Sequence, residues 1–217
     1  MMSTGETERQ RDRETERMSA PPSPHLPPSL HLPSAGSRSR LSISAAQECG
    51  IALGSNAGDR LANLRAAVAA LREIDPQVEV SQVYETAPVD CPDGSGAFLN
   101  AVAILSWTGA PVSLLHFLRG IECRLGRPTV RTRNAPRSMD LDIIYAGDAV
   151  AASDELTLPH PRLRERRFVL QPLCDLRPAL VLPGFDRPVR QLLDALPDEA
   201  VPPVRLNFSL QPLSASP

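Results

Sequence analysis

The 217-residue sequence contains no lysine, because its 23 lysine-or-arginine positions are all arginine. This absence excludes a phosphate-binding loop ending in Gly-Lys-Ser/Thr, a Schiff-base lysine for pyridoxal phosphate, and the strand lysine of protein kinases. A GC-rich genome that replaces lysine throughout would leave the same composition, and the exclusions hold in either case. If the protein binds phosphate groups, arginine must make the ionic contacts.

Cysteine pairs, long apolar runs and a strong net charge are also missing. The four cysteines form no CxxC pair, so no zinc site is expected. No apolar run approaches the ~18–20 residues of a membrane span, and no hydrophobic signal segment opens the sequence. The formal net charge of −2 provides no basic field for nucleic acid. We therefore expect a cytoplasmic protein that binds neither membrane nor nucleic acid.

Composition divides the sequence into three parts. Residues 1–46 combine a mixed-charge start with a Pro/Ser-rich stretch that cannot build a core, and we expect a disordered extension there. An over-extended gene start, with Met18 as the true first residue, would give the same pattern. Residues 47–200 have the rhythm of one compact domain, and we expect residues 201–217 to be a C-terminal tail.

Hydrophobic periodicity predicts alternating strands and helices. The strands are expected at residues 49–53, 78–84, 98–105 and 139–145, and the helices between Asp59 and Pro76, at 112–125 and at 163–174. The order β-α-β-β-α-β over residues 49–145 is typical of a ferredoxin-like antiparallel sheet. We therefore predict an α+β fold of three layers, in which helices cover both faces of the sheet.

Two aspartates stand two positions apart in the last of these strands. Strand geometry puts the carboxylates of Asp140 and Asp142 on one face, with Cα atoms roughly 6.6–7 Å apart, while Leu141 and Ile143 point into the core. A divalent cation such as Mg²⁺ would neutralise the repulsion between them. The alternative is an edge strand whose aspartates merely face water.

Arginines surround this carboxylate pair in the sequence. Residues 119–137 contain six arginines and one acidic residue, Glu122, and residues 162–167 contain four more arginines around Glu165. Arginine forks bind phosphate oxygens in pairs, so arginine clusters beside metal-binding carboxylates favour a polyphosphate site. A module that binds RNA or another polyanion without catalysis would use similar clusters, but it would need aromatic residues interleaved with the arginines, which residues 119–137 lack.

Other candidates depend on their neighbours for support. Gly54-Ser55-Asn56 is either an anion cradle or a tight turn after the first strand. His160, held between two prolines, could donate to a phosphate or simply be exposed. Phe98 and Phe168 could stack on a ring or pack in the core, and Asn100, on the strand face of Phe98, could bond the edge of a heterocycle.

Taken together, the motifs resemble those of the 6-hydroxymethyl-7,8-dihydropterin pyrophosphokinase family of folate biosynthesis. The densest match is RNAPRSMDLDII at residues 133–144. Five more segments follow the family's order: IALGSN at 51–56, YETAP at 84–88, FLNA at 98–101, Glu122 with Gly126-Arg127, and LPHP at 158–161 followed by Arg166 and Phe168. The resemblance covers residues 49–185.

The resemblance implies the reaction and the site. Pyrophosphate would pass from ATP to 6-hydroxymethyl-7,8-dihydropterin, with AMP as the second product, in a chain expected to act as a monomer. Asp140 and Asp142 would hold two Mg²⁺ ions. The ATP-binding residues would be Glu122, Arg127, Arg137, His160 and Arg166, of which Arg127 and Arg137 are also expected to be catalytic. The pterin would contact Thr86, Val89, Phe98, Asn100 and Phe168.

Three site positions are compared with the family's pattern. Asn134 stands where many members have tryptophan, Phe98 replaces a frequent tyrosine, and Pro161 follows the histidine where members have tyrosine or proline. The loops at residues 89–97 and 128–134 match the family's mobile lids, and we expect them to order when both substrates bind. Hydrogen exchange that stays unchanged in these loops on adding an ATP analogue and pterin would exclude that role.

Two further readings remain open, one of them enzymatic. A nucleotidyltransferase would also join a Gly-Ser turn to a metal-binding carboxylate pair, but it would place them close together, whereas Ser55 and Asp140 are 85 positions apart. An inactive member of the pyrophosphokinase family is the second reading. The intact aspartates and flanking arginines count against it.

Overall fold

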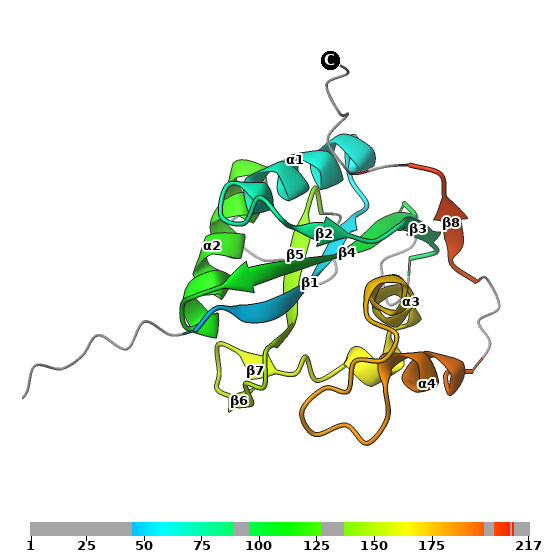
Figure 1. Ribbon diagram of the computed structural model, residues 1–217. Coiled ribbons are helices and arrows are strands. Elements are labelled where there is room, and N and C mark those ends of the chain that lie inside the picture. The colour runs from blue at the N-terminus through cyan, green and yellow to red at the C-terminus, as the bar shows by residue number, and fades with distance from the viewer. Residues whose placement is uncertain (1–44, 89–95, 127–136, 198–201, 209, 211–217) are drawn as a thin grey trace, which may run out of the picture. The chain divides into compact units, whose positions relative to one another are not determined.

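The computed structural model describes residues 45–88, 96–126, 137–197, 202–208 and 210. The predicted extension therefore lies almost entirely outside the described residues. The elements, shown in Figure 1, are β1 (Gln47–Ser55), α1 (Arg60–Arg72), β2 (Glu79–Val80), β3 (Val83–Thr86), β4 (Phe98–Trp107), α2 (Pro111–Arg124), β5 (Asp140–Ala146), β6 (Ala151–Ala152), β7 (Thr157–Leu158), the 3-10 turn η1 (Leu163–Glu165), α3 (Arg167–Leu176), α4 (Val189–Asp194) and β8 (Val204–Leu206).

The central sheet has the order β5-β1-β4-β3-β8, with β2 also paired to β4, and every pairing is antiparallel. Since β4 is antiparallel to both β1 and β3, these two strands run in the same direction with β4 between them. The short strands β6 and β7 form a separate hairpin. The predicted α+β class with an antiparallel sheet is confirmed.

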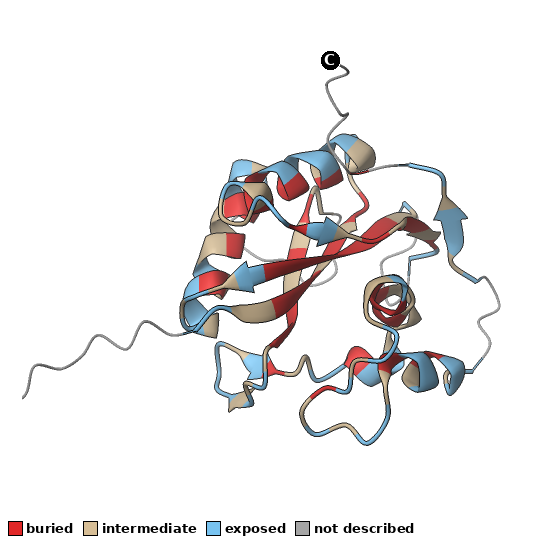
Figure 2. Ribbon diagram, in the orientation of Figure 1, coloured by how far each residue is buried: buried red, intermediate tan, exposed pale blue. Residues whose placement is uncertain are grey.

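Side chains alternate along the strands and feed a core on each side of the sheet. In β4, Ala101 and Ala103 pack in a cluster with α1 and α2, whereas Val102 and Ile104 pack in a second cluster with α3 and α4. Figure 2 shows buried residues along the strands and on the inner sides of these helices. The helices begin as the sequence predicts: the Asp59 carboxylate accepts from the Ala62 N–H, and Pro111 opens α2.

A β-bulge interrupts β5 just beyond the two aspartates. Ile51 pairs with Ile143 and Gly50 pairs with Tyr145, so Ile144 is an extra residue in β5. The carbonyl of Ile144 accepts a hydrogen bond from the His160 N–H at 2.8 Å. The bulge thus fixes the backbone of His160 beside the strand that carries the carboxylates.

Two predicted elements are divided in the structure. The single strand expected at 78–84 is β2 and β3, because the Ser81 hydroxyl accepts from the Val102 N–H and replaces a regular ladder bond. The helix expected at 163–174 is η1 followed by α3, because Arg166 between them has extended backbone (φ −108°, ψ 90°). Residues 204–206, expected in a tail, form β8 and pair with β3. None of the described helices is long and apolar enough to cross a bilayer.

Candidate active site

The predicted site residues of β4 and β5 share one face of the sheet. Asp140 pairs with Gly54 of β1, and Gly54 pairs on its other side with Asn100 of β4. Directly opposed residues in antiparallel strands project to the same face, and so do residues two positions apart in one strand. Asp142 and Phe98 therefore lie on this face too, which is the side covered by α3.

Gly54, which has no side chain, forms the floor of the site between Asp140 on one side and Asn100 and Phe98 on the other. A Cβ atom at this position would lie 3.6 Å from Asn100 Oδ1, 3.9 Å from Phe98 Cδ1 and 4.0 Å from Asp140 Cβ. These are ordinary contact distances, so neither the backbone nor a collision demands glycine here. What glycine provides is open space between the aromatic and amide groups and the carboxylate.

Each carboxylate faces an arginine. Arg137 Nη1 lies 2.6 Å from Asp140 Oδ2, and Arg166 Nη1 lies 3.6 Å from Asp142 Oδ2. The side chain of Asp142 is 44% exposed and that of Asp140 is 21% exposed, so both can be reached from solvent. Among the described residues, no group of three or more His, Cys, Asp or Glu side chains could hold a metal by itself. Two open carboxylates instead suit a hard cation that takes its remaining oxygens from a bound phosphate.

The turn after β1 holds the segment that leads into β5. The Ser55 hydroxyl donates to the Ser138 carbonyl at 2.5 Å, and the Arg137 N–H donates to Asn56 Oδ1 at 2.7 Å. The Asn56 N–H in turn donates to the Arg137 carbonyl at 3.1 Å. With Ser55 fully buried and Asn56 nearly so, these side chains act on the protein backbone. Gly54-Ser55-Asn56 was predicted to be either an anion cradle or a tight turn, and these contacts support the tight turn.

Glu122 of α2 contacts the same strand from its open edge. The buried side chain is 3% exposed, and Oε1 accepts from the Leu141 N–H at 2.8 Å. Leu141 stands between the two aspartates and is buried, as predicted, together with Ile143. The Glu122 carboxylate therefore helps to place the strand from which Asp140 and Asp142 project.

His160 and Arg166 present two donors side by side. The Arg162 N–H donates to His160 Nδ1 at 3.1 Å, which leaves the proton of the neutral ring on Nε2. Burial, together with the charges of Arg166 and Arg162, lowers the pKa of His160 to about 4. His160 Nε2 lies 3.4 Å from Arg166 Nη1. Two adjacent donors of this kind favour an anionic oxygen between them.

The aromatic and amide candidates form the other end of the face. Asn100 is 5% exposed, and its Nδ2 donates to Thr86 Oγ1 at 2.9 Å. Phe98 is half-buried beside it and pairs with Thr86. Phe168 is also half-buried, and the Arg166 guanidinium carbon lies 5.6 Å from the centre of its ring. Val89, Arg127 and Asn134 lie outside the described residues, as do most residues of the two predicted lid loops.

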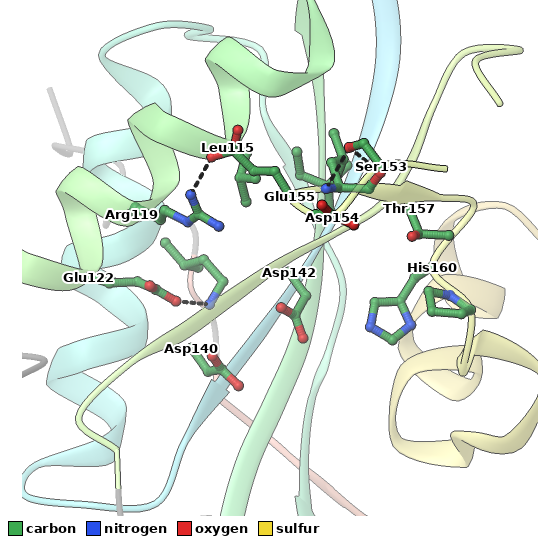
Figure 3. Close-up of a pocket in the computed structure, with 14 residues that line it drawn as sticks. Leu115, Arg119, Glu122, Asp140, Asp142, Ser153, Asp154, Glu155, Thr157 and His160 are labelled. Carbon is green, nitrogen blue, oxygen red and sulfur yellow. Dashed lines mark hydrogen bonds and ion pairs between the residues drawn. The ribbon is translucent and has the colours of Figure 1, made fainter. Parts of the chain in front are cut away.

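A pocket of about 260 Å³ opens beside the carboxylates of Asp140 and Asp142. It lies between α2, β5 and the β6–β7 hairpin, and Asp140, Asp142 and His160 line it (Figure 3). Glu155 of the hairpin joins its wall to α2, because Oε1 lies 2.6 Å from Arg119 Nη1 and 2.8 Å from His116 Nε2. No local sequence pattern predicts this link, because Glu155 is 36 positions from Arg119 and 39 positions from His116.

A family model matches residues 50–178, and its description is 7,8-dihydro-6-hydroxymethylpterin-pyrophosphokinase. The chain belongs to this family. The match spans every described element of the face that carries the aspartates, the arginines and the aromatic residues. Membership of the pyrophosphokinase family confirms the resemblance on which the site was predicted.

Curated relatives agree with this assignment. The 2-amino-4-hydroxy-6-hydroxymethyldihydropteridine pyrophosphokinase of Pseudomonas aeruginosa is 38% identical over 154 residues, which are 70% of this chain and 93% of that protein. The enzyme of the same name from Bacillus subtilis is 42% identical over 128 residues, 58% of this chain and 75% of that protein. The folic acid synthesis protein fol1 of Schizosaccharomyces pombe is 38% identical, but the match spans only 21% of its length.

Solved structures share the fold. A Plasmodium falciparum HPPK-DHPS triple mutant with pteroate superposes with a TM-score of 0.55 at 13% identity, over 71% of this chain and 44% of that chain. The wild-type protein of the same organism gives a TM-score of 0.53 over 70% of this chain and 45% of that chain. At this identity the likeness concerns the fold alone.

Proposed function

We propose that this chain transfers pyrophosphate from ATP to 6-hydroxymethyl-7,8-dihydropterin and releases AMP, a step of folate biosynthesis. The observation that carries the proposal is the shared sheet face, where a carboxylate pair with its arginines and an aromatic and amide corner lie on either side of Gly54. This arrangement suits two substrates that must react with each other. Family membership supports the same reaction.

The phosphate end of the site would bind ATP through charge. Arg137, Arg166 and His160 would contact the phosphate oxygens, and Arg127 would join them as the family resemblance implies. Asp140 and Asp142 fit two Mg²⁺ ions, because they are accessible and can share them with phosphate oxygens. When bound, the ions would supply charge neutralisation on the phosphates. The nucleoside would occupy the pocket between α2, β5 and the β6–β7 hairpin.

The opposite end would bind the pterin. Phe98 and Phe168 would stack on its ring, while Asn100 and Thr86, already bonded to each other, would bond its polar edge. Val89 completes this set by resemblance. We further propose that the fold is a three-layer, ferredoxin-like arrangement. The strand order supports this architecture and the site, because it places β4 and β5 on the two sides of β1.

The transfer itself needs alignment. The pterin hydroxymethyl oxygen attacks the β-phosphorus, the bond from that phosphorus to the bridging oxygen of the α-phosphate breaks, and AMP leaves with this oxygen. The hydroxyl proton is released. The chain's residues hold both substrates, stabilise charge on the phosphates and form no covalent bond to them.

An assay of AMP formation tests the proposal. Purified full-length chain is supplied with ATP and Mg²⁺, with and without 6-hydroxymethyl-7,8-dihydropterin, and then with EDTA. We expect AMP only when pterin and Mg²⁺ are both present. Folded protein that releases none favours the inactive-member reading, and salt-sensitive RNA binding without Mg²⁺ dependence would support the polyanion-binding module.

Two variants test the phosphate end. Asp142→Ala is expected to lower kcat at least 100-fold with the fold preserved, because one of two cation ligands is lost. Arg137→Lys is expected to lower kcat about tenfold or more, because a point charge cannot replace a two-point guanidinium contact. Circular dichroism checks the fold. Wild-type turnover in either variant would remove that residue from the mechanism.

A further inference from the structure

We propose that Arg60 is a positioning residue for the pterin, which it never touches. Its guanidinium ties together the two strand ends that carry Thr86 and Phe98. The inference rests on the proposed function. It assigns a role to the first residue of α1, which lies in neither the phosphate end nor the pterin end of the site.

Two hydrogen bonds from one nitrogen make this link. Arg60 Nη1 donates to Glu85 Oε1 at 2.7 Å and to the Ala97 carbonyl at 2.8 Å. Glu85 directly precedes Thr86, and Ala97 directly precedes Phe98. Thr86 and Phe98 form the last pair of the β3–β4 ladder. The Arg60 side chain therefore joins the chain on both sides of that pair.

The link acts from the opposite face of the sheet. Glu85 is next to Thr86 in a strand, so their side chains project to opposite faces. Glu85 and Arg60 lie on the side of α1, while Thr86, Asn100 and Phe98 lie on the proposed pterin side. Arg60 can reach the pterin contacts only through the backbone, which fits a positioning role and excludes direct binding.

Electrostatics gives a reason for arginine at this position. The first turn of α1 contains no acidic residue, and a cation at a helix N-terminus opposes the helix dipole. Glu85 supplies the opposite charge from β3, at the ion-pair distance given above. The two side chains are 33% and 35% exposed, so the pair is partly shielded from water. Helix formation alone would favour another residue here.

Steady-state kinetics of the full chain tests the inference. In Arg60→Ala we expect KM for 6-hydroxymethyl-7,8-dihydropterin to rise about fivefold or more, with KM for ATP changed less than twofold. Arg60→Lys should recover part of the loss, because an ammonium can still donate to both oxygens. Arg65→Ala is the matched control, since Arg65 is exposed on the same helix, and it should behave as wild type.

Glu85→Ala provides a second route to the same answer. It should also raise KM for pterin. In the double variant Arg60→Ala with Glu85→Ala, the fold-rise in KM for pterin should be smaller than the product of the two single fold-rises. An unchanged KM for pterin in folded Arg60→Ala or Glu85→Ala, or equal rises in KM for both substrates, overturns the inference and leaves the proposed function standing. Absence of pterin-dependent AMP formation in the wild type overturns both.

Discussion

His160 is a described residue of the site whose protonation is altered by the fold. Burial of the ring, together with the charges of Arg166 and Arg162, lowers the pKa of His160 to about 4, so the neutral ring is favoured, and its Nδ1 accepts from the Arg162 N–H. The ring therefore stays neutral throughout the physiological range. A neutral Nε2–H can donate to a phosphate oxygen without adding charge, and the ionic contacts are left to the arginines.

The lowered pKa of His160 makes folding stability depend on pH. The unfolded ring takes up a proton near pH 6.5, whereas the folded ring resists protonation down to about pH 4. The contribution of His160 to the free energy of unfolding is therefore complete above pH 6.5 and is lost as the pH falls toward 4. Between pH 7 and pH 5 the loss amounts to about 2 kcal/mol.

Urea unfolding of wild type and His160→Gln at pH 7 and pH 5, without ATP or Mg²⁺, measures this contribution. The free energy of unfolding of the wild type should fall by about 2 kcal/mol more than that of the variant. Equal falls in the two proteins would mean that the folded ring has an ordinary pKa.

At the scale of elements, β5 is placed by contacts from both of its sides. Ser55 and Asn56 hold the segment before it, and Glu122 bonds the Leu141 N–H at its open edge. Glu122 was predicted to bind ATP, and that role stays a prediction. Its bond to Leu141 shows that the same carboxylate also has a partner within the fold.

Removing the Glu122 carboxylate should loosen β5. In Glu122→Ala the Leu141 N–H loses a buried partner, which costs about 2–3 kcal/mol of unfolding free energy. Glu122→Gln keeps an acceptor oxygen and should retain most of that stability. Hydrogen exchange at the Leu141 amide, measured without substrates, should accelerate in the alanine variant alone. Slow exchange in both variants would leave ATP contact as the role of Glu122.

The sequence predicted individual elements better than the contacts between them. Apolar periodicity and local caps placed α1, α2 and β4 within a few residues, because those signals come from neighbouring positions. No local pattern indicates the hydrogen bond between Ser81 and Val102, so periodicity predicted one strand where the structure has β2 and β3. Residue types and motifs indicated which residues form the site. The hydrogen bonds from Ser55 and Asn56 to residues more than 80 positions away leave no local sequence pattern that could predict them.

At the scale of the whole folded unit, the sheet does not end where composition changes. Beyond residue 200, β8 pairs with β3, Leu210 is 4% exposed within the core shared with α1 and α2, and its carbonyl accepts from Arg72. Composition alone could not reveal this, because a single buried leucine and a three-residue strand leave little pattern. The predicted tail thus contributes to the folded unit.

Leu210→Ala should reduce the unfolding free energy by about 2–4 kcal/mol, as expected for a truncated core leucine. Phe208→Ala is the matched control, because Phe208 is 44% exposed and its loss should change stability by less than about 0.5 kcal/mol. Chemical denaturation of the full chain compares the two. Similar small effects would support the predicted domain boundary at residue 200.

The open floor at Gly54 has a consequence for inhibitors. Since a methyl group fits there at 3.6–4.0 Å from its neighbours, Gly54→Ala should fold normally yet narrow the space between the two substrate ends. A compound that bridges both ends across this floor should lose affinity, while a smaller compound confined to one end should not. Comparing the Kd of both compounds with the two proteins would show whether one alanine substitution is a path to drug resistance.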